Sequence, residues 1–166
     1  ENSNGNIHDN GTINITSNSI RSIVSNKPTS SSYHPKNVLD KSHDGIYQAE
    51  QGDINFWIMF DFKEMRVNIS KYAVQSTQYA NINCVRNWVL EISDDGENWE
   101  IVDSHSDFTE LDSPEKMLFF DAGSRRFVRY CRFRHNGELC PPDFCPSGTT
   151  SGGGINYMEF FGKIRI

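Results

Sequence analysis

The feature that most constrains the fold is a period of two in the apolar residues from Asn55 onward. Four aromatic or aliphatic residues alternate with other side chains here: Phe56, Ile58, Phe60 and Phe62. Such alternation puts apolar side chains on one face of an extended strand. Similar short segments recur at 71–76, 88–93, 99–103, 117–121, 127–134 and 155–166, and none repeats with a helical period. The sequence therefore predicts an all-β fold, an antiparallel β-sandwich or jelly roll.

The start of the chain differs in composition from the rest. Of the first 32 residues, 15 are Asn or Ser, a composition that buries too little apolar surface to offset the entropy of ordering. We therefore expect residues 1–19 to form a flexible polar segment and residues 20–166 to form one domain, with a first strand near 20–25. The length of 166 residues suits one domain, which we expect to belong to a larger protein.

The net charge of −6 limits the partners. A nucleic-acid-binding surface needs a basic face, so we expect no nucleic acid partner, and an acidic chain is also poorly suited to an anionic membrane. The sequence lacks the G-x-S-x-G, H-E-x-x-H and G-x-x-x-x-G-K-[ST] motifs of common enzymes. We therefore expect no enzymatic activity. We also expect the isolated domain to be a monomer.

The four cysteines allow several interpretations. Cys84 and Cys131 lie in apolar sequence segments, which favours reduced, buried thiols. Cys140 and Cys145 lie in a Pro-rich loop, where they could form a disulfide or, with His135, contribute to a zinc site that would still need a fourth ligand. Free thiols are the preferred interpretation, and they favour the cytoplasm slightly. Three N-glycosylation triplets favour secretion, so the compartment stays open.

Several segments together resemble a known family. In chain order they are Tyr33–Asp40 (YHPKNVLD), Phe56–Phe62 (FWIMFDF), Tyr72–Ser76 (YAVQS), Asn87–Trp99 (NWVLEISDDGENW), Phe127–Phe133 (FVRYCRF) and Met158–Gly162 (MEFFG). This order resembles the discoidin domain, also called the coagulation factor V/VIII type C domain, in the galactose-binding-domain-like superfamily. The resemblance covers roughly residues 30–162, and it is nearest to versions found in intracellular multidomain proteins of eukaryotes, including many protists.

The resemblance implies an eight-stranded antiparallel jelly roll whose loops at one end bind a ligand. Members of the family bind galactose-type glycans, anionic lipid headgroups, collagen or other proteins. The chain lacks the cysteines that secreted members often join near the two ends of the domain, and its acidity departs from lipid-binding members. We therefore expect a non-catalytic module that recognises a glycan or a protein surface. The alternatives are an anionic-membrane module or a hydrolase on a β-scaffold.

Three long loops, at 28–53, 77–87 and 135–154, are the candidate binding region, and the resemblance places the first two at the binding end. The polar and aromatic candidates for contacting a ligand are His43, Tyr47, Gln78, Tyr79, Arg86, Arg134 and His135. Tyrosine offers a flat apolar face with a hydroxyl, and arginine offers forked donors. The alternative is that these are ordinary solvated loop residues, or, for Arg132 and Arg134, members of internal ion pairs.

The resemblance also implies a structural calcium ion. Many sugar-binding relatives hold calcium through an aspartate in the first long loop, backbone carbonyls and a glutamate near the C-terminus. Asp40, Asp44 and Glu159 match these places, and carboxylates suit calcium. The usual threonine of the motif is missing, so the alternative is that Asp40 caps a turn and Glu159 pairs with an arginine such as Arg129. No other cofactor is expected.

Overall fold

The structure is a computed structural model that describes residues 8–9, 11–21, 33–40, 45–80, 83–139 and 152–166. The strands are β1 (Asn14–Ser17), β2 (Tyr47–Gln48), β3 (Trp57–Asp61), β4 (Arg66–Gln75), β5 (Trp88–Ser93), β6 (Glu100–His105), β7 (Met117–Asp121), β8 (Tyr130–His135), β9 (Gly154–Ile155) and β10 (Tyr157–Arg165). Two short 3-10 helices accompany them, η1 (Pro35–Leu39) and η2 (Glu110–Asp112). No helix in these described ranges is long and apolar enough to cross a membrane.

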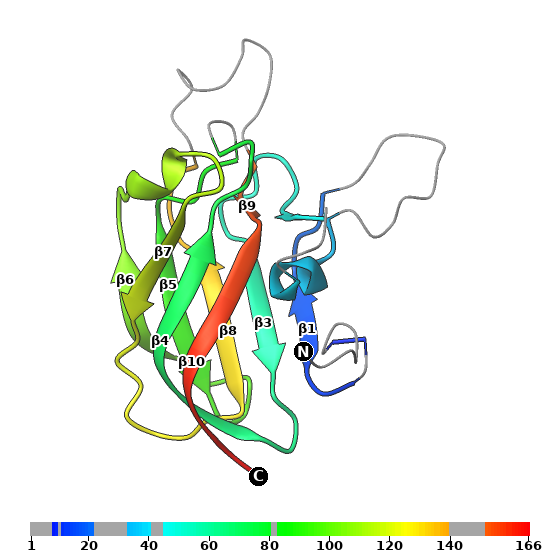
Figure 1. Cartoon of the computed structure of the whole chain (residues 1–166), viewed down its shortest axis with the longest axis vertical. Helices are drawn as coiled ribbons and strands as arrows, with labels where there is room; N and C mark the ends of the chain where they lie inside the picture. The colour runs from blue at the N-terminus through cyan, green and yellow to red at the C-terminus, as the bar shows by residue number, and fades with distance from the viewer. Residues whose placement is uncertain (1–7, 10, 22–32, 41–44, 81–82, 140–151) are drawn as a thin grey trace.

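The strands form a β-sandwich. One sheet has the order β1-β3-β8-β5-β6, a second has the order β10-β4-β7, and β2 pairs with β9 in a small third sheet. All of these pairs are antiparallel. Figure 1 shows the three-stranded sheet lying over the five-stranded sheet. The predicted all-β antiparallel sandwich is confirmed.

The core lies between the two main sheets and is built from the alternating residues. Ile58 and Phe60 of β3 and Leu90 of β5 are fully buried, as the period of two predicts. Trp88 is also fully buried. Its ring stacks on His105 at 4.4 Å between centroids, and its Nε1 donates a hydrogen bond to the hydroxyl of Tyr72 at 2.9 Å. The expectation that Trp88 is a core residue is confirmed.

The fold begins earlier in the chain than the sequence suggests. Residues 14–17 form β1, in which Ile15 pairs with Phe60 of β3, and Ile13 and Ile15 are buried. The boundary expected at residue 19 is therefore wrong. The reason is that two isoleucines at a spacing of two suffice for a short edge strand, although Asn and Ser dominate the surrounding composition. Most of the strand expected at 20–25 lies outside the described residues.

A buried ion-pair network crosses the outer face of the five-stranded sheet. The carboxylate of Glu91, only 3% exposed, accepts hydrogen bonds from Arg132 Nε at 2.7 Å and Arg134 Nη2 at 2.7 Å. Burial by itself raises the pKa of Glu91, but the hydrogen bonds and charges of Arg134 and Arg132 outweigh it and hold the pKa below its ordinary value. The alternative of internal ion pairs for these two arginines is thus confirmed.

The cysteines differ from the prediction of free thiols. Cys131 is free and buried, as predicted. Cys84 is disulfide-bonded, and its partner lies outside the described residues, as do Cys140 and Cys145. The prediction of a reduced Cys84 was wrong because an apolar environment accommodates a thiol and a disulfide equally well. A disulfide favours an oxidising compartment over the cytoplasm.

Candidate functional site

Segments that are far apart in sequence meet at one end of the sandwich. β4 ends and β5 begins at this end, and the segments before β3 and after β8 lie there as well (Figure 1). The described parts of all three predicted long loops are therefore neighbours. This arrangement follows from antiparallel pairing, because successive strands reverse direction and return their connections to the same ends.

A cavity of about 420 Å³ opens at this end. Its walls come from the segment after β1, from β2 and from the β4–β5 loop, and its lining residues are Arg21, Tyr33, Ile46, Gln48, Gln78, Tyr79 and Asn83. Two of the predicted ligand residues, Gln78 and Tyr79, are in this set, and both are exposed to solvent. Tyr79 is 50% exposed, which leaves much of its side chain available to a ligand.

The wall of the cavity is held by a chain of hydrogen bonds. Arg21 Nη1 donates to Gln48 Oε1 at 2.9 Å, and Gln48 Nε2 donates to Asn83 Oδ1 at 2.7 Å. The backbone N–H of Arg21 also donates to the carbonyl of Gln48 at 2.9 Å. Gln48 and Asn83 are buried, so these contacts fix the polar groups of the wall before a ligand arrives.

Tyr79 is presented by a tight turn. Its backbone N–H donates to Thr77 Oγ1 at 3.1 Å, and its carbonyl accepts a hydrogen bond from the N–H of Asn83 at 2.9 Å. Elsewhere in the lining, the guanidinium of Arg21 lies 5.6 Å from the centre of the Tyr33 ring. A concave site with aromatic side chains and a few fixed polar groups has the composition expected of a small-molecule site.

Two predicted ligand residues are core residues instead. Tyr47 is fully buried, its hydroxyl donates to the carbonyl of Ser19 at 2.7 Å, and burial raises its pKa. His135 is also fully buried, and its ring stacks on Phe56 at 5.0 Å. Burial lowers the pKa of His135, which keeps the ring neutral. The prediction that these two side chains contact a ligand is wrong.

Two predicted arginines are neutralised within the fold. Arg86 makes a double hydrogen bond with Asp112 of η2, with Nε–Oδ1 at 3.1 Å and Nη2–Oδ2 at 2.5 Å. Arg134 is held by Glu91. Their positions correct the prediction that their forked donors face a ligand. His43, the last of the predicted set, lies outside the described residues.

Five residues of the cavity were not among the predicted ligand residues: Arg21, Tyr33, Ile46, Gln48 and Asn83. Arg21 lies next to the Asn- and Ser-rich start, and Gln48 belongs to a strand of only two residues. Asn83 is one of many asparagines, and Tyr33 was noted only as part of the family resemblance. No local pattern marks any of these residues, because their meeting depends on how β2 and the β4–β5 loop pack together.

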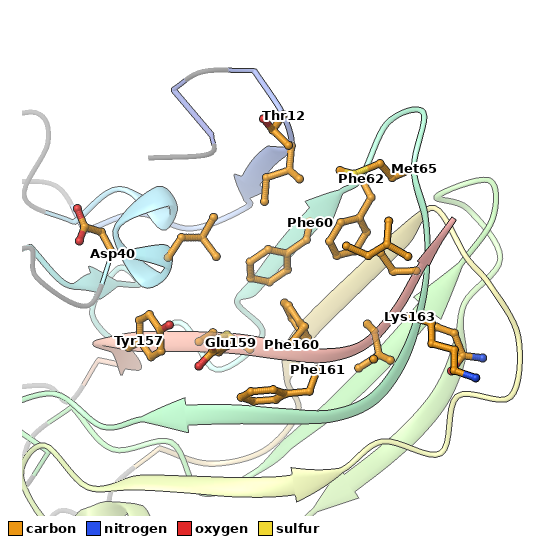
Figure 2. A pocket seen from close by; sticks show the side chains of 18 residues that line it. Thr12, Asp40, Phe60, Phe62, Met65, Tyr157, Glu159, Phe160, Phe161 and Lys163 are labelled. Carbon is orange, nitrogen blue, oxygen red and sulfur yellow. The ribbon is translucent and has the colours of Figure 1, made fainter. Parts of the chain in front are cut away.

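The predicted calcium ligands lie along a second, larger cavity of about 640 Å³ beside β10. Asp40 and Glu159 both line it, and Figure 2 shows Tyr157 beside Glu159 on β10, with Asp40 farther away near η1. The pKa of Tyr157 is raised by burial, by the charge of Glu159 and its hydrogen bond with that residue, and by the charge of Asp40. Among the described residues no three His, Cys, Asp or Glu side chains form a metal-binding group, and Asp44 lies outside that set.

The alternatives to calcium are tested in part. The backbone N–H of Asp40 caps η1 through a hydrogen bond to the carbonyl of Asn37 at 3.2 Å. Arg129 pairs with Asp61 at 2.8 Å, so it is not the partner of Glu159. The calcium site therefore stays a prediction.

The comparison with family models finds one family. The F5/8 type C domain matches residues 14–137. No curated protein matches the chain.

Solved structures with the same fold cover nearly the whole chain. The C-terminal domain of a chitobiase from Bacteroides fragilis has a TM-score of 0.68 at 15% identity, over 94% of this chain and 97% of that one. CpGH89CBM32-5 from Clostridium perfringens, in complex with GalNAc-β-1,3-galactose, has a TM-score of 0.65 at 14% identity, over 92% and 96%. Chitosan-binding module 1 of a chitosanase/glucanase from Paenibacillus sp. IK-5 has a TM-score of 0.63 at 15% identity, over 91% and 96%.

At these identities the structures show a shared fold, and the family match spans well over half of the chain. Both agree with the resemblance carried by the Asn87–Trp99 segment. The chain belongs to the F5/8 type C, or discoidin, domain family.

Proposed function

We propose that this domain is a non-catalytic module that recognises a glycan in the cavity at the loop end of the sandwich. The observation that carries the proposal is the exposed side chain of Tyr79 beside the fixed Arg21–Gln48–Asn83 chain in one cavity. A sugar ring presents an apolar face that suits an aromatic side chain, and its hydroxyls both donate and accept hydrogen bonds. Amide and guanidinium groups meet that need from a rigid wall.

The structural neighbours support a glycan over the other ligand classes of the family. One of them is in complex with GalNAc-β-1,3-galactose, and another is a chitosan-binding module. The exposed aromatic pair Phe119–Phe161, with ring centres 6.0 Å apart, lies away from the cavity on β7 and β10. We expect this pair to play no part in sugar binding, which makes it a useful control.

We also propose a structural calcium ion and an oxidising compartment for this domain. Asp40, Asp44 and Glu159 are the proposed ligands of a structural calcium ion, with an effect on stability and not on the chemistry of sugar binding. The disulfide at Cys84 favours an oxidising environment. It stands against the expectation that the chain is nearest to intracellular members of the family, which stays a prediction.

A binding experiment tests the function. The domain is applied to an array of neutral and acidic oligosaccharides, and the affinity of each hit is measured by isothermal titration calorimetry. We expect Tyr79→Ala to lower the affinity at least tenfold, about 1.4 kcal/mol, while the stability changes by less than about 0.5 kcal/mol, as for other surface substitutions.

Phe119→Ala is the matched control, because it also removes an exposed aromatic ring. Normal binding by Tyr79→Ala together with weak binding by Phe119→Ala would move the site to the face of the three-stranded sheet. Absence of binding to every sugar, with capture of a protein ligand that requires Tyr79, would replace the glycan by a protein partner.

A further inference from the structure

The cavity holds a positive charge, on Arg21, that no carboxylate in the described part of the chain neutralises. The guanidinium of Arg21 contacts the amide oxygen of Gln48 and the ring of Tyr33, and no carboxylate among the described residues forms an ion pair with it. By contrast, the sheets and their connections pair other arginines with carboxylates, namely Arg86, Arg126, Arg129, Arg132 and Arg134. Four arginines, Arg21, Arg66, Arg125 and Arg165, have no ion pair with a described carboxylate, and among these four only Arg21 lines the cavity.

The lining of the cavity sharpens this contrast. The seven described residues that line it include one cation and no acidic side chain. Arg21 is half-buried, so its charge is screened less by water than that of a fully exposed arginine. A fixed charge of one sign in a concave site attracts a ligand of the opposite sign.

The geometry of the guanidinium group identifies the class of anion. Its contact with Gln48 uses Nη1, which leaves the Nε and Nη2 edge without an acceptor among the described residues. That edge carries two parallel N–H groups, which match the two oxygens of a carboxylate. The cation–π contact with Tyr33 helps to hold the plane of the group in place.

We propose that the site takes a sugar that carries a carboxylate, with the carboxylate paired to Arg21 and the sugar ring beside Tyr79. This inference rests on the proposed glycan-binding function and narrows its ligand to acidic sugars, either the uronic acids of polysaccharides or a terminal sialic acid. Charge-assisted hydrogen bonds are about twice as strong as neutral ones. An acidic sugar should therefore bind with higher affinity than its neutral counterpart.

The test compares each acidic sugar with a neutral counterpart that lacks the carboxylate charge. Tri-galacturonic acid, its fully methyl-esterified form, 3′-sialyllactose and lactose are titrated into the domain at 50 mM and 500 mM NaCl. We expect one of the two acidic sugars to bind at least tenfold more tightly than its neutral counterpart, and the preferred acid to show which source of carboxylate the site uses. A higher salt concentration should lower the affinity for the acidic sugar and leave the affinity for the neutral sugar unchanged, because mobile ions screen the charge of Arg21.

Variants of two arginines assign the effect to Arg21. Arg21→Gln should remove the preference for the acid, and Arg21→Lys should keep part of it because the charge remains without the fork. Arg125→Gln is the matched control, since Arg125 is exposed and lies outside the cavity. If Arg21→Gln lowers the melting temperature, the Arg21→Lys variant and the salt dependence still decide the question.

The outcomes separate this inference from the function on which it rests. If neutral sugars bind as tightly as their acidic counterparts, or if Arg21→Gln keeps the preference for acid, the inference fails and the glycan-binding function stands. If neither these probes nor any sugar of the array binds, both fail. An acid preference that Arg125→Gln removes and Arg21→Gln does not would place the anion site elsewhere.

Discussion

Replacement of Trp88 by alanine tests how the sandwich is held together. Trp88 is fully buried. Its ring stacks on His105 at 4.4 Å and on Phe133 at 5.8 Å, and it meets Phe120 edge-on at 5.4 Å. Its Nε1 donates to Tyr72, whose hydroxyl donates onward to Asp103 Oδ2 at 2.7 Å. The substitution removes an aromatic side chain that joins both sheets.

The expected cost follows from these contacts. Truncation of a buried aromatic residue to alanine costs about 3–5 kcal/mol of unfolding free energy. A lost hydrogen bond, such as the one to Tyr72, costs about 0.5–1.5 kcal/mol. We take about 4–5 kcal/mol, because the two contributions overlap. In a domain of this size 1 kcal/mol shifts the melting temperature by about 2–4 °C, so we expect a decrease of about 8–20 °C.

Thermal unfolding followed by circular dichroism measures this decrease. Trp88→Phe keeps an aromatic ring against His105 and removes only the donor and part of the volume, so we expect a smaller loss of about 1–2 kcal/mol. Phe119→Ala, at a residue that is 61% exposed, should change stability by less than about 0.5 kcal/mol. A Trp88→Ala protein that melts within about 2 °C of the wild type would refute the reasoning.

Three further predictions concern pH, redox state and metal. The pKa values of Glu91 and Asp61 are held below their ordinary values of 4.5 and 3.8, because their arginine partners outweigh burial. The stability that these two carboxylates contribute is therefore present above those values and is lost as the pH falls below them. A urea midpoint that stays constant from pH 7 to pH 3 would contradict this expectation. Reduction of the disulfide at Cys84 should lower the free energy of unfolding by about 2–4 kcal/mol. It should also weaken sugar binding, because the neighbouring residue Asn83 lines the cavity. Calorimetry with and without reductant measures both effects. If calcium binds, it should raise the melting temperature of metal-stripped protein, and the combined Asp40→Ala and Glu159→Ala changes should abolish the rise; identical melting curves with calcium and with chelator would exclude the metal.

The strands could be predicted because their signal is local. The alternation around β3 and β5 and the turn at Asp95 can be read from neighbouring residues, and β7 has the predicted bounds, Met117–Asp121. In that turn Asp95 Oδ1 accepts hydrogen bonds from the backbone N–H groups of Glu97 and Asn98 at 2.8 Å. These contacts span only three residues of sequence, so the sequence determines them directly.

The site could be predicted only in part because its geometry is not local. Gln78 and Tyr79 could be predicted because they are polar and aromatic residues of a long loop, and the structure leaves both exposed. Tyr47, like Tyr79, lies in a predicted long loop, but β2 pairs Tyr47 with Ile155 of β9, more than 100 positions away, and its ring is buried. Arg21 depends in the same way on its contact with Gln48. No local pattern distinguishes a loop residue that faces a ligand from one that another segment covers.

The most direct test of the central claim is an NMR titration of the ¹⁵N-labelled domain with the oligosaccharide that binds most tightly in the array. Glycan binding in the loop-end cavity predicts that the largest shift changes fall on the side-chain amides of Gln48 and Gln78 and on the backbone amides of Tyr79 and Asn83. Changes centred on Phe119 and the adjacent face of the three-stranded sheet, with the cavity residues unperturbed, would contradict it.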